Sequence, residues 1–324
     1  MRLLITGVAG FVGGHLVDLL TSQHPDVALF GLTRPGWPVP AGLDARVSLI
    51  ESELEDSSSV DQAIAGVRPD AIVHLAAQAS PQQSWREPEA TLRTNLFGFL
   101  HLLEACRRHQ LRPRTLVVGS SEEYGRIDPS DLPLREEAPL RPLSPYATSK
   151  VAQGYLGLQY ALSADIPVVR TRTFHHTGPG RGETFVEASF ARQVAQIEQG
   201  RQPPVIEVGN LEAVRDFCDV RDVVRAYWDL LDRGQAGEVY NVCSGRGTPV
   251  RDLLDLLVAR CHRPVEVRLD PKRLRASDVP AVVGDSTRLR RTVGWEPRIP
   301  LDQTLSDLLE EMRARVAAEA DASA

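Results

Sequence analysis

Lysine is scarce in this chain of 324 residues. Of its 37 basic residues only Lys150 and Lys272 are lysines, and all the others are arginines. The 43 acidic residues bring the net charge to −6, and this mildly acidic balance argues against nucleic-acid binding through overall charge. Because arginine is so strongly preferred, the position of each remaining lysine is worth noting.

Cysteine and long apolar runs are scarce as well. The four cysteines, Cys106, Cys218, Cys243 and Cys261, show no CxxC or zinc-ligand spacing, so we expect reduced, mostly buried thiols and no metal site. No apolar run approaches the roughly 20 residues that span a bilayer. Residues 3–6 lead directly into glycines, which is not a signal-peptide pattern. We therefore expect a cytoplasmic protein without a membrane partner.

The chain begins with a pattern typical of nucleotide-binding proteins. A buried strand over 3–6 is followed by Gly7, Gly10 and Gly13, and a helical pattern then runs to about residue 23. In a dinucleotide-binding βαβ unit such glycines allow a tight turn, close approach of the pyrophosphate and packing of the helix on the strand. The spacing here is G-x-x-G-x-x-G.

Strand and helix patterns alternate after this turn. We expect strands at 27–33, 47–50, 71–75, 115–119 and 167–172, and helices at 58–66, 88–109 and 145–163. This alternation predicts an α/β fold with a Rossmann-like, doubly wound parallel sheet and a smaller α/β substrate-binding domain. We assign residues 1–173 with 216–243 to the first domain and 174–215 with 244–324 to the second. From about residue 317 an alanine-rich tail is expected to fray.

The end of the second strand indicates which cofactor is preferred. An acidic residue at this place would bind the adenosine 2′-hydroxyl and favour NAD. This chain has Thr33 and Arg34 instead, and an arginine can pair with a 2′-phosphate. We therefore expect NADP(H), with NAD(H) as the alternative.

A Tyr-x-x-x-Lys pair indicates the chemistry. Tyr146 and Lys150 share one helix face, and Ser120 lies at the end of a preceding strand, where open α/β sheets place their active sites. Tyr146 can exchange a proton with a carbonyl oxygen, and Ser120 can bind that oxygen. We expect Lys150 to lower the pKa of the phenol, which is near 10 in free tyrosine.

Further motifs follow in order along most of the chain. They are T-G-V-A-G-F-V-G at 6–13, H-L-A-A-Q at 74–78, N-L-F-G at 95–98, G-S-S-E-E-Y-G at 119–125, S-P-Y-A-T-S-K at 144–150, R-T-F-H-H-T-G-P-G at 172–180, R-D-F-C-D-V-R-D at 215–222 and Y-N-V-C-S-G at 240–245. With this set the chain resembles the extended short-chain dehydrogenase/reductases that act on nucleotide sugars.

This resemblance implies a set of site residues. Ser120, Tyr146 and Lys150 would form the catalytic triad, and Asn95 would be a buried supporting polar residue. The residues implied for cofactor contact are Gly7, Gly10, Phe11, Val12, Gly13, Thr33, Arg34, Glu53, Leu54, Leu75, Ala76, Ala77, Asn95, Tyr146, Lys150 and Phe174. A homodimer through the helices at about 88–109 and 145–163 is usual in the family.

Candidate ligands of the nucleotide sugar follow from the same resemblance. Arg215 and Arg275 match family positions for the diphosphate, and arginine binds phosphate oxygens bidentately. His175 stands where the family usually has Asn, and its protonation at about pH 6–7 would add a charge. Ser121 and Glu122 complete the expected set. The weaker candidates are Arg181 and Arg192.

The segments 180–186, 207–217 and 240–245 resemble the enzymes of GDP-6-deoxyhexose synthesis, and two activities fit. The favoured one is NAD(P)H-dependent reduction of the C4 keto group of GDP-4-dehydro-6-deoxy-D-mannose to GDP-D-rhamnose, for which the triad suffices. The alternative is a GDP-mannose 4,6-dehydratase, which needs one more acid/base group. Glu122 matches the position of that carboxylate. The R-D-F-C-D-V motif favours the reductase.

Two other possibilities stay open. Another nucleotide-sugar reductase or epimerase would use the same triad. A non-catalytic nucleotide-binding sensor would keep the fold and commonly lose the tyrosine or the lysine, whereas this chain retains Tyr146 and Lys150. The sequence leaves open the base of the nucleotide and the stereochemistry at C4.

Overall fold

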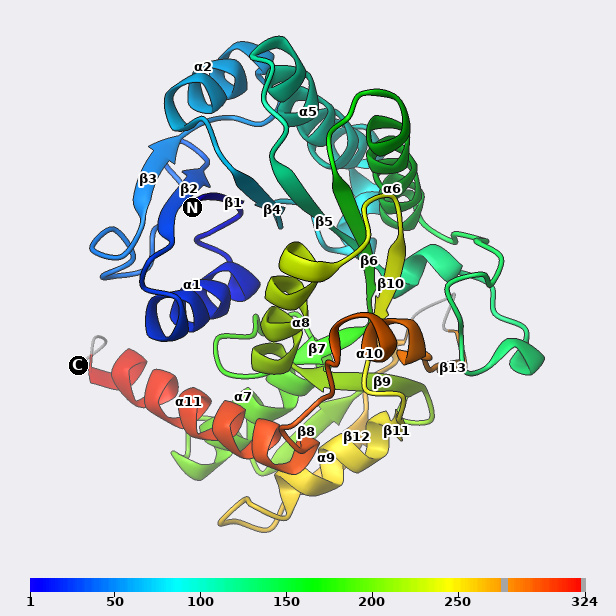
Figure 1. Cartoon of the computed structure of the whole chain (residues 1–324). Coiled ribbons are helices and arrows are strands. Elements are labelled where there is room, and N and C mark those ends of the chain that lie inside the picture. The colour runs from blue at the N-terminus through cyan, green and yellow to red at the C-terminus, as the bar shows by residue number, and fades with distance from the viewer. Residues whose placement is uncertain (275–278, 322–324) are drawn as a thin grey trace.

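The large sheet of the molecule contains seven parallel strands. The computed structural model describes residues 1–274 and 279–321. The strand order is β10-β6-β5-β4-β1-β2-β3 (Figure 1). These strands are β1 (Arg2–Thr6), β2 (Ala28–Thr33), β3 (Ser48–Glu51), β4 (Ala71–His74), β5 (Arg114–Ser120), β6 (Val168–Thr173) and β10 (Val239–Val242). The order reverses between β1 and β4, and this is the switch point at which doubly wound sheets bind ligands.

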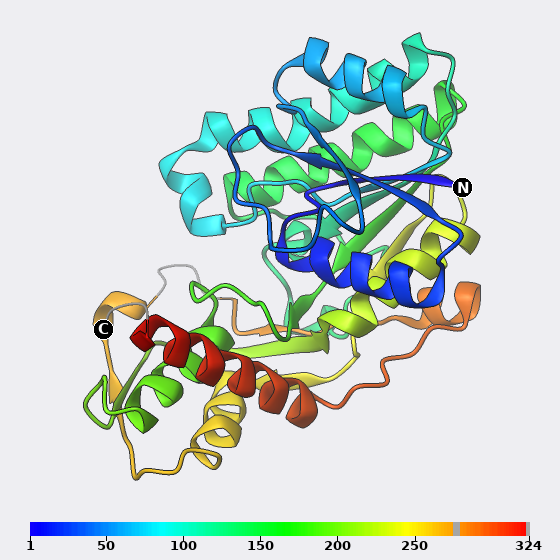
Figure 2. The same ribbon diagram turned by 90° about the vertical axis from the view of Figure 1, so that its left-hand side faces the viewer.

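Helices cover both faces of this sheet. Helices α1 (Phe11–Gln23) and α8 (Val220–Arg233) lie on one face, and α2 (Ser57–Val67), α5 (Gly98–Arg108) and α6 (Pro145–Ser163) lie on the other (Figure 2). Because both faces are covered, strand residues such as Leu3, Leu4 and Ile5 are all fully buried. The predicted doubly wound parallel sheet is confirmed.

The start of α6 determines where the predicted catalytic tyrosine lies. Ser144 caps the helix, since its hydroxyl accepts a hydrogen bond from the Ala147 main-chain N–H at 3.0 Å. Pro145 occupies the first helical position, where its missing N–H costs nothing. The cap and the proline together fix the first turn of α6, which carries Tyr146, beside the end of β5.

A smaller region lies below the large sheet in Figure 1. It has a sheet in the order β11-β9-β13 with β7 also paired to β9, and a separate pair β12-β8. Its elements are β7 (His175–Thr177), α7 (Val186–Glu198), β8 (Val205–Val208), β9 (Val214–Asp219), β11 (Gly247–Pro249), α9 (Val250–Val258), β12 (Glu266–Leu269), β13 (Ala281–Val282) and α11 (Leu301–Asp321). Apolar residues of α7, α9 and α11 form its core.

Two elements do not follow the predicted division of the chain. The predicted boundary between residues 215 and 216 falls inside β9, and the whole strand belongs to the smaller sheet. Conversely, α10 (Thr287–Val293) returns to the large core, in which Leu289, Val293 and Trp295 are buried. The indole N–H of Trp295 donates to the Asp222 carbonyl in α8 at 2.9 Å. Burial of these apolar side chains therefore brings a late segment back to the first domain.

Two predicted elements also need correction. The expected helix over 88–109 is divided into α4 (Pro88–Leu92), a π-helical turn (Arg93–Phe97) and α5. The expected frayed tail from about residue 317 is helical as far as Asp321. The Arg192 guanidinium and the Glu319 carboxylate form an ion pair at 2.8 Å, which ties this end of α11 to α7.

Some features are absent from the part of the chain that the structure describes. Within residues 1–274 and 279–321, no helix combines the length and the hydropathy needed to cross a membrane. The same residues include no group of three His, Cys, Asp or Glu side chains that could hold a metal ion. Cys106, Cys218 and Cys243 are buried free thiols, and Cys261 is partly exposed.

Candidate active site

The glycine turn between β1 and α1 admits no larger side chains at two of its positions. Gly7 has a left-handed φ of +70°, and a Cβ there would lie 2.9 Å from the Ala76 nitrogen. At Gly13 a Cβ would lie 2.5 Å from the carbonyl oxygens of Gly7 and Val8. The helix α1 starts after Gly10, so its first N–H groups face this turn. Such a turn can hold an anionic diphosphate.

Polar contacts of Thr6, the last residue of β1, hold the glycine turn against β4. The Thr6 hydroxyl lies 2.8 Å from Nδ1 of His74 and accepts from the Ala76 main-chain N–H at 3.1 Å. His74 is fully buried, and its burial lowers the pKa of the imidazole to about 3. His74 is therefore neutral and structural, and it aligns the predicted cofactor residues Leu75, Ala76 and Ala77.

Asn95 lies in the π-helical turn (Arg93–Phe97). This turn is the interruption in the predicted long helix. The amide oxygen of Asn95 accepts from the Gln78 main-chain N–H at 2.8 Å, and its amide nitrogen donates to the Ser149 hydroxyl at 2.9 Å. The side chain is fully buried. Extra residues in a helical turn commonly occur at functional sites, and here the turn directs Asn95 toward α6. Asn95 is thus buried and hydrogen-bonded on two sides, and its role as a supporting residue of the site stays a prediction.

Lys150 is linked to Asn95 by hydrogen bonds through Gln153. Its ammonium nitrogen donates to the Val118 carbonyl at 2.9 Å and to the amide oxygen of Gln153 at 3.0 Å. Gln153 in turn donates to the Asn95 carbonyl at 2.8 Å. Burial lowers the pKa of Lys150 to about 8, and the charge of Glu123 opposes this shift. Gln153 was not among the predicted site residues, although it lies three residues after Lys150 on the same helix face.

Tyr146 and Ser120 meet at the carboxyl end of β5. Burial raises the pKa of Tyr146 to about 12, and a hydrogen bond with Ser120 opposes this effect. The charges of Glu122 and Glu123 raise this pKa further, whereas that of Arg181 lowers it. The pKa of the phenol is therefore raised and not lowered as expected, because burial outweighs the effects that lower it. Tyr146 remains protonated at neutral pH.

The turn that follows Ser120 is a 3-10 helix (Ser121–Tyr124) with a reciprocal cap. The Ser120 hydroxyl accepts from the Glu122 main-chain N–H at 3.2 Å, and the Glu123 carboxylate accepts from the Ser120 main-chain N–H at 2.9 Å. Glu123 also pairs with Arg172 at 3.0 Å. Neither of these two residues was among the predicted site residues.

The predicted adenosine end of the cofactor site lies at the ends of β2 and β3. Arg34 and Glu53 form an ion pair with an Nε–Oε2 distance of 3.0 Å. Two residues predicted to contact the cofactor are thus neighbours, and each has a partner before any ligand binds. Thr33 is buried beside them, and its carbonyl accepts from the Ser52 main-chain N–H at 2.9 Å. Leu54 is buried and packs against Gly98.

The loop after β7 covers the start of α1. The Arg181 guanidinium lies over the Phe11 ring at 5.1 Å and over the Phe185 ring at 3.4 Å, and it pairs with the buried Glu187 at 3.2 Å. The ring of His176 stacks on Phe11 at 6.1 Å. Arg181, a weak candidate for the substrate phosphates, therefore lies at the predicted cofactor turn. No spacing rule in the sequence pairs residue 181 with residue 11.

The predicted substrate residues come from several elements. His175 in β7 pairs with Phe217 in β9, and Arg215 lies two residues before Phe217 on the same face of β9. The Arg215 guanidinium donates to the Val214 and Val279 carbonyls. Ser121 is buried in the turn after β5. Arg275 lies outside the described residues.

Two further residues have surroundings that differ from the predicted ones. The side chain of Phe174, expected near the cofactor, is buried in an apolar cluster with Tyr124, Leu134 and Cys243. Arg192 lines a cavity of about 400 Å³ in the smaller region. The other lining residues are Glu183, Ser189, Gln193, Gln196, Gln202, Pro203, Val205, Glu207, Arg268 and Arg273.

Comparisons with known proteins agree with this geometry. The family model described as GDP-mannose 4,6 dehydratase matches residues 4–308. GDP-6-deoxy-D-mannose reductase from Pseudomonas aeruginosa is 39% identical over 98% of this chain and 99% of the relative. The chain belongs to the GDP-mannose 4,6 dehydratase family.

Further relatives and solved structures match along most of the chain. GDP-mannose 4,6 dehydratase 2 from Caenorhabditis elegans is 31% identical over 96% of this chain and 87% of the relative. Among solved structures, RMD from Pseudomonas aeruginosa complexed with NADPH matches with a TM-score of 0.86 and 37% identity, over 97% of this chain and 99% of the other. UDP-glucose 4-epimerase from Thermotoga maritima with UDP-glucose also has a TM-score of 0.86, at 28% identity, over 98% and 100%. These matches confirm the predicted extended short-chain dehydrogenase/reductase family and fold.

Proposed function

We propose that the protein reduces the C4 keto group of GDP-4-dehydro-6-deoxy-D-mannose to GDP-D-rhamnose with NADPH, and that NADH is a weaker substitute. The observation that carries this proposal is the protonated, buried Tyr146, which is hydrogen-bonded to Ser120 at the carboxyl end of β5. Carbonyl reduction needs a proton donor at this place. The full-length similarity to GDP-6-deoxy-D-mannose reductase supports the choice of substrate.

The residues present fit a dinucleotide. The glycine turn provides a cradle that a Cβ at Gly7 or Gly13 would fill, and the N-terminus of α1 favours the diphosphate. Arg34 would pair with the 2′-phosphate of NADPH. NADPH supplies the hydride when it is bound. Lys150, held by Val118 and Gln153, would bind the nicotinamide ribose.

Side chains of the protein would then deliver a proton to the C4 oxygen. Ser120 would donate a hydrogen bond to the C4 oxygen and orient it. Tyr146 would donate its phenolic proton to that oxygen as the C4 hydroxyl forms. The positive charge of Lys150 favours the phenolate that remains, and bulk water can return the proton. His175 and Arg215, on adjacent strands of the smaller region, would bind the diphosphate of the sugar nucleotide.

A second candidate activity rests on Glu122. The charge of Glu122 raises the pKa of Tyr146, and Glu122 lies in the turn that directly follows Ser120. A carboxylate at this place could remove a proton from C5, as a GDP-mannose 4,6-dehydratase requires. Relatives with dehydratase names, such as GDP-mannose 4,6 dehydratase 2 from Caenorhabditis elegans, support this alternative.

A two-tube assay distinguishes these activities. The first tube contains the protein, NADPH and GDP-4-dehydro-6-deoxy-D-mannose, and the second contains the protein, NADP and GDP-mannose. Loss of the reduced-nicotinamide absorbance in the first tube alone supports the reductase. A 4-keto product in the second tube makes Glu122 a working base and the protein a dehydratase. Tight NADPH binding without turnover in either tube contradicts both activities and agrees with a nucleotide-binding sensor.

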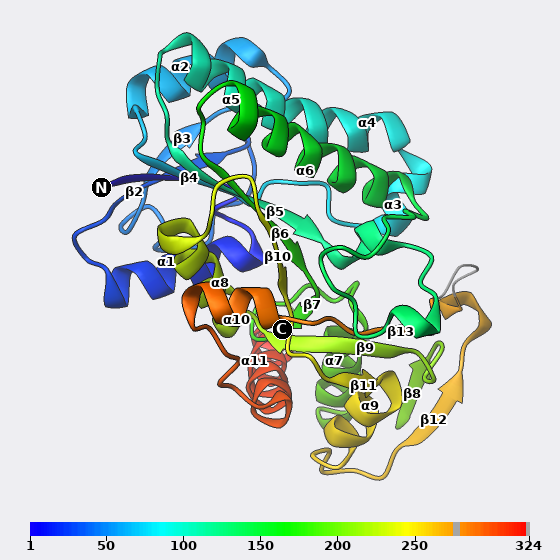
Figure 3. The same ribbon diagram turned by 45° about the vertical axis from the view of Figure 1, so that its right-hand side comes forward.

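We also propose a cytoplasmic homodimer. Helices α4, α5 and α6 lie together on one outer side of the large sheet (Figure 3), and large apolar side chains are exposed on α6 and in the π-helical turn before α5. These are Phe97, Tyr155 and Leu162. Exposed apolar patches of this kind are typical of protein–protein interfaces. Sedimentation equilibrium at micromolar concentration should show twice the chain mass of 35.6 kDa, and a monomer would contradict the dimer.

A further inference from the structure

Glu123 is buried directly beneath the proposed catalytic serine. Its side chain is only 5% exposed, and its two oxygens have different partners. One oxygen accepts from the Ser120 main-chain N–H at 2.9 Å, and the other accepts from Nε of Arg172 at 3.0 Å. A Cβ at Gly119 would collide with the first oxygen. The carboxylate therefore occupies a site built around it at the end of β5.

Arg172 extends this contact away from the active site. Its Nη1 donates to the Glu136 carbonyl at 2.8 Å and lies 3.3 Å from the Tyr124 hydroxyl. Tyr124 donates to the amide oxygen of Asn241 in β10 at 2.7 Å. Both carboxylate oxygens of Glu123 thus have a fixed partner, and a buried charged group is tolerated when it is hydrogen-bonded in this way.

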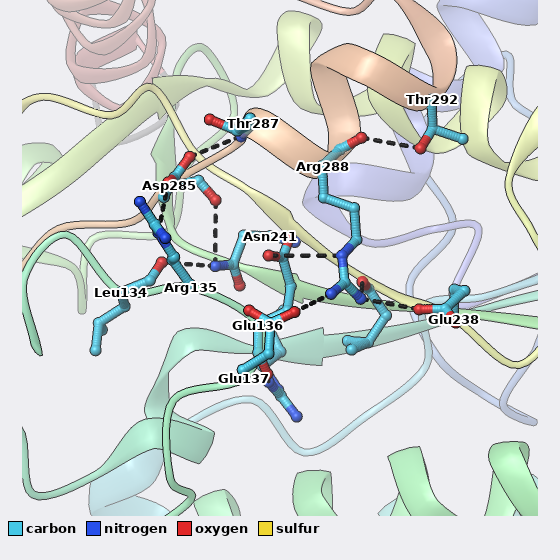
Figure 4. Close-up of polar contacts among 12 residues, drawn as sticks. Leu134, Arg135, Glu136, Glu137, Glu238, Asn241, Asp285, Thr287, Arg288 and Thr292 are labelled. Carbon is cyan, nitrogen blue, oxygen red and sulfur yellow. Dashed lines mark hydrogen bonds and ion pairs between the residues drawn. The ribbon is translucent and has the colours of Figure 1, made fainter.

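The loop between Tyr124 and α6 is held from the other side. The Glu136 carboxylate accepts from the Asn241 main-chain N–H at 2.9 Å, and Arg288 in α10 pairs with Glu137 and Glu238 (Figure 4). This loop connects the turn that carries Ser120 with the helix that carries Tyr146. Glu123 and Arg172 therefore lie where this loop leaves the turn that carries Ser120, and the loop then leads to the helix that carries Tyr146.

We propose that Glu123 is a positioning residue whose carboxylate fixes the Ser120 main-chain N–H and thereby aims the Ser120 hydroxyl at the substrate oxygen. The inference rests on the proposed function only in that it uses the reduction as a readout. The hydroxyl itself is an acceptor for the Glu122 N–H at 3.2 Å, so its direction follows that of the main chain. An unheld Ser120 could rotate away, and a misplacement of about 1 Å can cost about 100-fold in rate.

Two matched double variants test this role without leaving a buried charge unpaired. Glu123→Gln/Arg172→Met keeps an oxygen that can accept from Ser120, whereas Glu123→Met/Arg172→Met does not. Both variants lack the ion pair, and replacing both partners of such a pair is far better tolerated than removing one. We expect kcat of the Met variant to be about 30-fold below that of the Gln variant, with equal dissociation constants for NADPH.

The Ser120→Ala background separates positioning from a general structural role. If Glu123 acts through the Ser120 hydroxyl, exchanging Gln for Met at position 123 should change kcat less than about twofold once that hydroxyl is gone. Equal kcat values for the two double variants would overturn the proposal. A 30-fold difference that persists in the Ser120→Ala background would overturn it as well.

Amide hydrogen exchange distinguishes a failure of this inference from a failure of the proposed function. The Ser120 amide should exchange at least about tenfold faster in Glu123→Met/Arg172→Met than in Glu123→Gln/Arg172→Met, with or without a substrate. If the wild-type protein does not reduce the keto sugar, only the proposed function fails, and this measurement still tests Glu123. Equal exchange at Ser120 in the two variants would contradict the role of Glu123.

Discussion

Two Arg–Glu ion pairs lie near the carboxyl ends of strands of the large sheet. Their nitrogen–oxygen distances agree, but the exposure of their side chains to solvent differs greatly. Arg34–Glu53 and Arg172–Glu123 have the same nitrogen–oxygen distance, 3.0 Å. The first pair follows β2 and β3, with side chains 67% and 37% exposed. The second lies beside the end of β5, with side chains 6% and 5% exposed.

This difference in burial separates two kinds of site. An exposed ion pair contributes little to stability, so Arg34 can exchange its partner for a ligand phosphate at small cost. A buried pair is held by its surroundings, and loss of one partner leaves an uncompensated charge. The proposed adenosine end of the site is therefore adaptable, whereas the catalytic end is rigid.

The largest effect should come from the rigid end. Tyr146→Phe removes the proposed proton donor without changing the buried volume much, so kcat should fall by about 10²- to 10⁴-fold. NADPH binding should persist, because Lys150 and the glycine turn are unchanged. Stopped-flow absorbance for turnover and fluorescence titration for binding measure the two quantities. Turnover near that of the wild type would remove Tyr146 from the mechanism.

Stability should distinguish the two ion pairs directly. Arg172→Met leaves Glu123 buried and unpaired, so the free energy of unfolding should fall by about 3–5 kcal/mol. Arg34→Met is the matched control, and its effect should stay within about 0.5 kcal/mol. Urea denaturation followed by circular dichroism measures both variants. Equal losses for both would show that burial does not separate the two pairs.

Cofactor preference tests the adaptable end. Arg34→Ala should weaken NADPH binding by about tenfold, the equivalent of about 1.4 kcal/mol, and change NADH binding much less. Glu53→Gln keeps the shape and releases Arg34 from its partner, so it should leave NADPH binding as tight or make it tighter. Isothermal titration with both cofactors provides the four values. Equal weakening of NADPH and NADH by Arg34→Ala would contradict pairing with the 2′-phosphate.

The smallest effect should be a pH dependence. Burial lowers the pKa of Lys150 to about 8, so Lys150 loses its positive charge as the pH rises through this value. Reductase kcat/KM should therefore fall above about pH 8, whereas Tyr146, whose pKa is about 12, stays protonated. Lys150→Arg keeps the charge at all these pH values and should lack the decline. A wild-type profile that is flat to pH 10 would contradict this assignment.

Local sequence patterns predicted those parts of the fold in which a single short segment determines its own secondary structure. The apolar run before Gly7 and the glycine spacing indicate strand, turn and helix within residues 2–23, and the structure confirms all three. The return of α10 to the large core could not be predicted in this way. Leu289 and Trp295 pack against elements that lie far away in sequence, and hydrophobic periodicity does not identify a partner.

The candidate site shows the same limit. Tyr146 and Lys150 are four residues apart on one helix, so their juxtaposition follows from helix geometry. Glu123 and Arg172 are 49 residues apart, and nothing in either segment indicates that they form a pair. The pKa of Tyr146 was expected to be lowered and is raised instead. Burial causes this rise, and the extent of burial is a tertiary property that a local sequence pattern does not show.

The position of α10 has a consequence for cooperativity. The large core contains Leu3 near the start of the chain and Trp295 near its end, while the chain between them also builds the smaller region. Neither half of the polypeptide therefore contains the whole of this large core. A fragment that ends before α10 would expose the part of α8 that Trp295 covers, and the whole chain should melt in one transition rather than two.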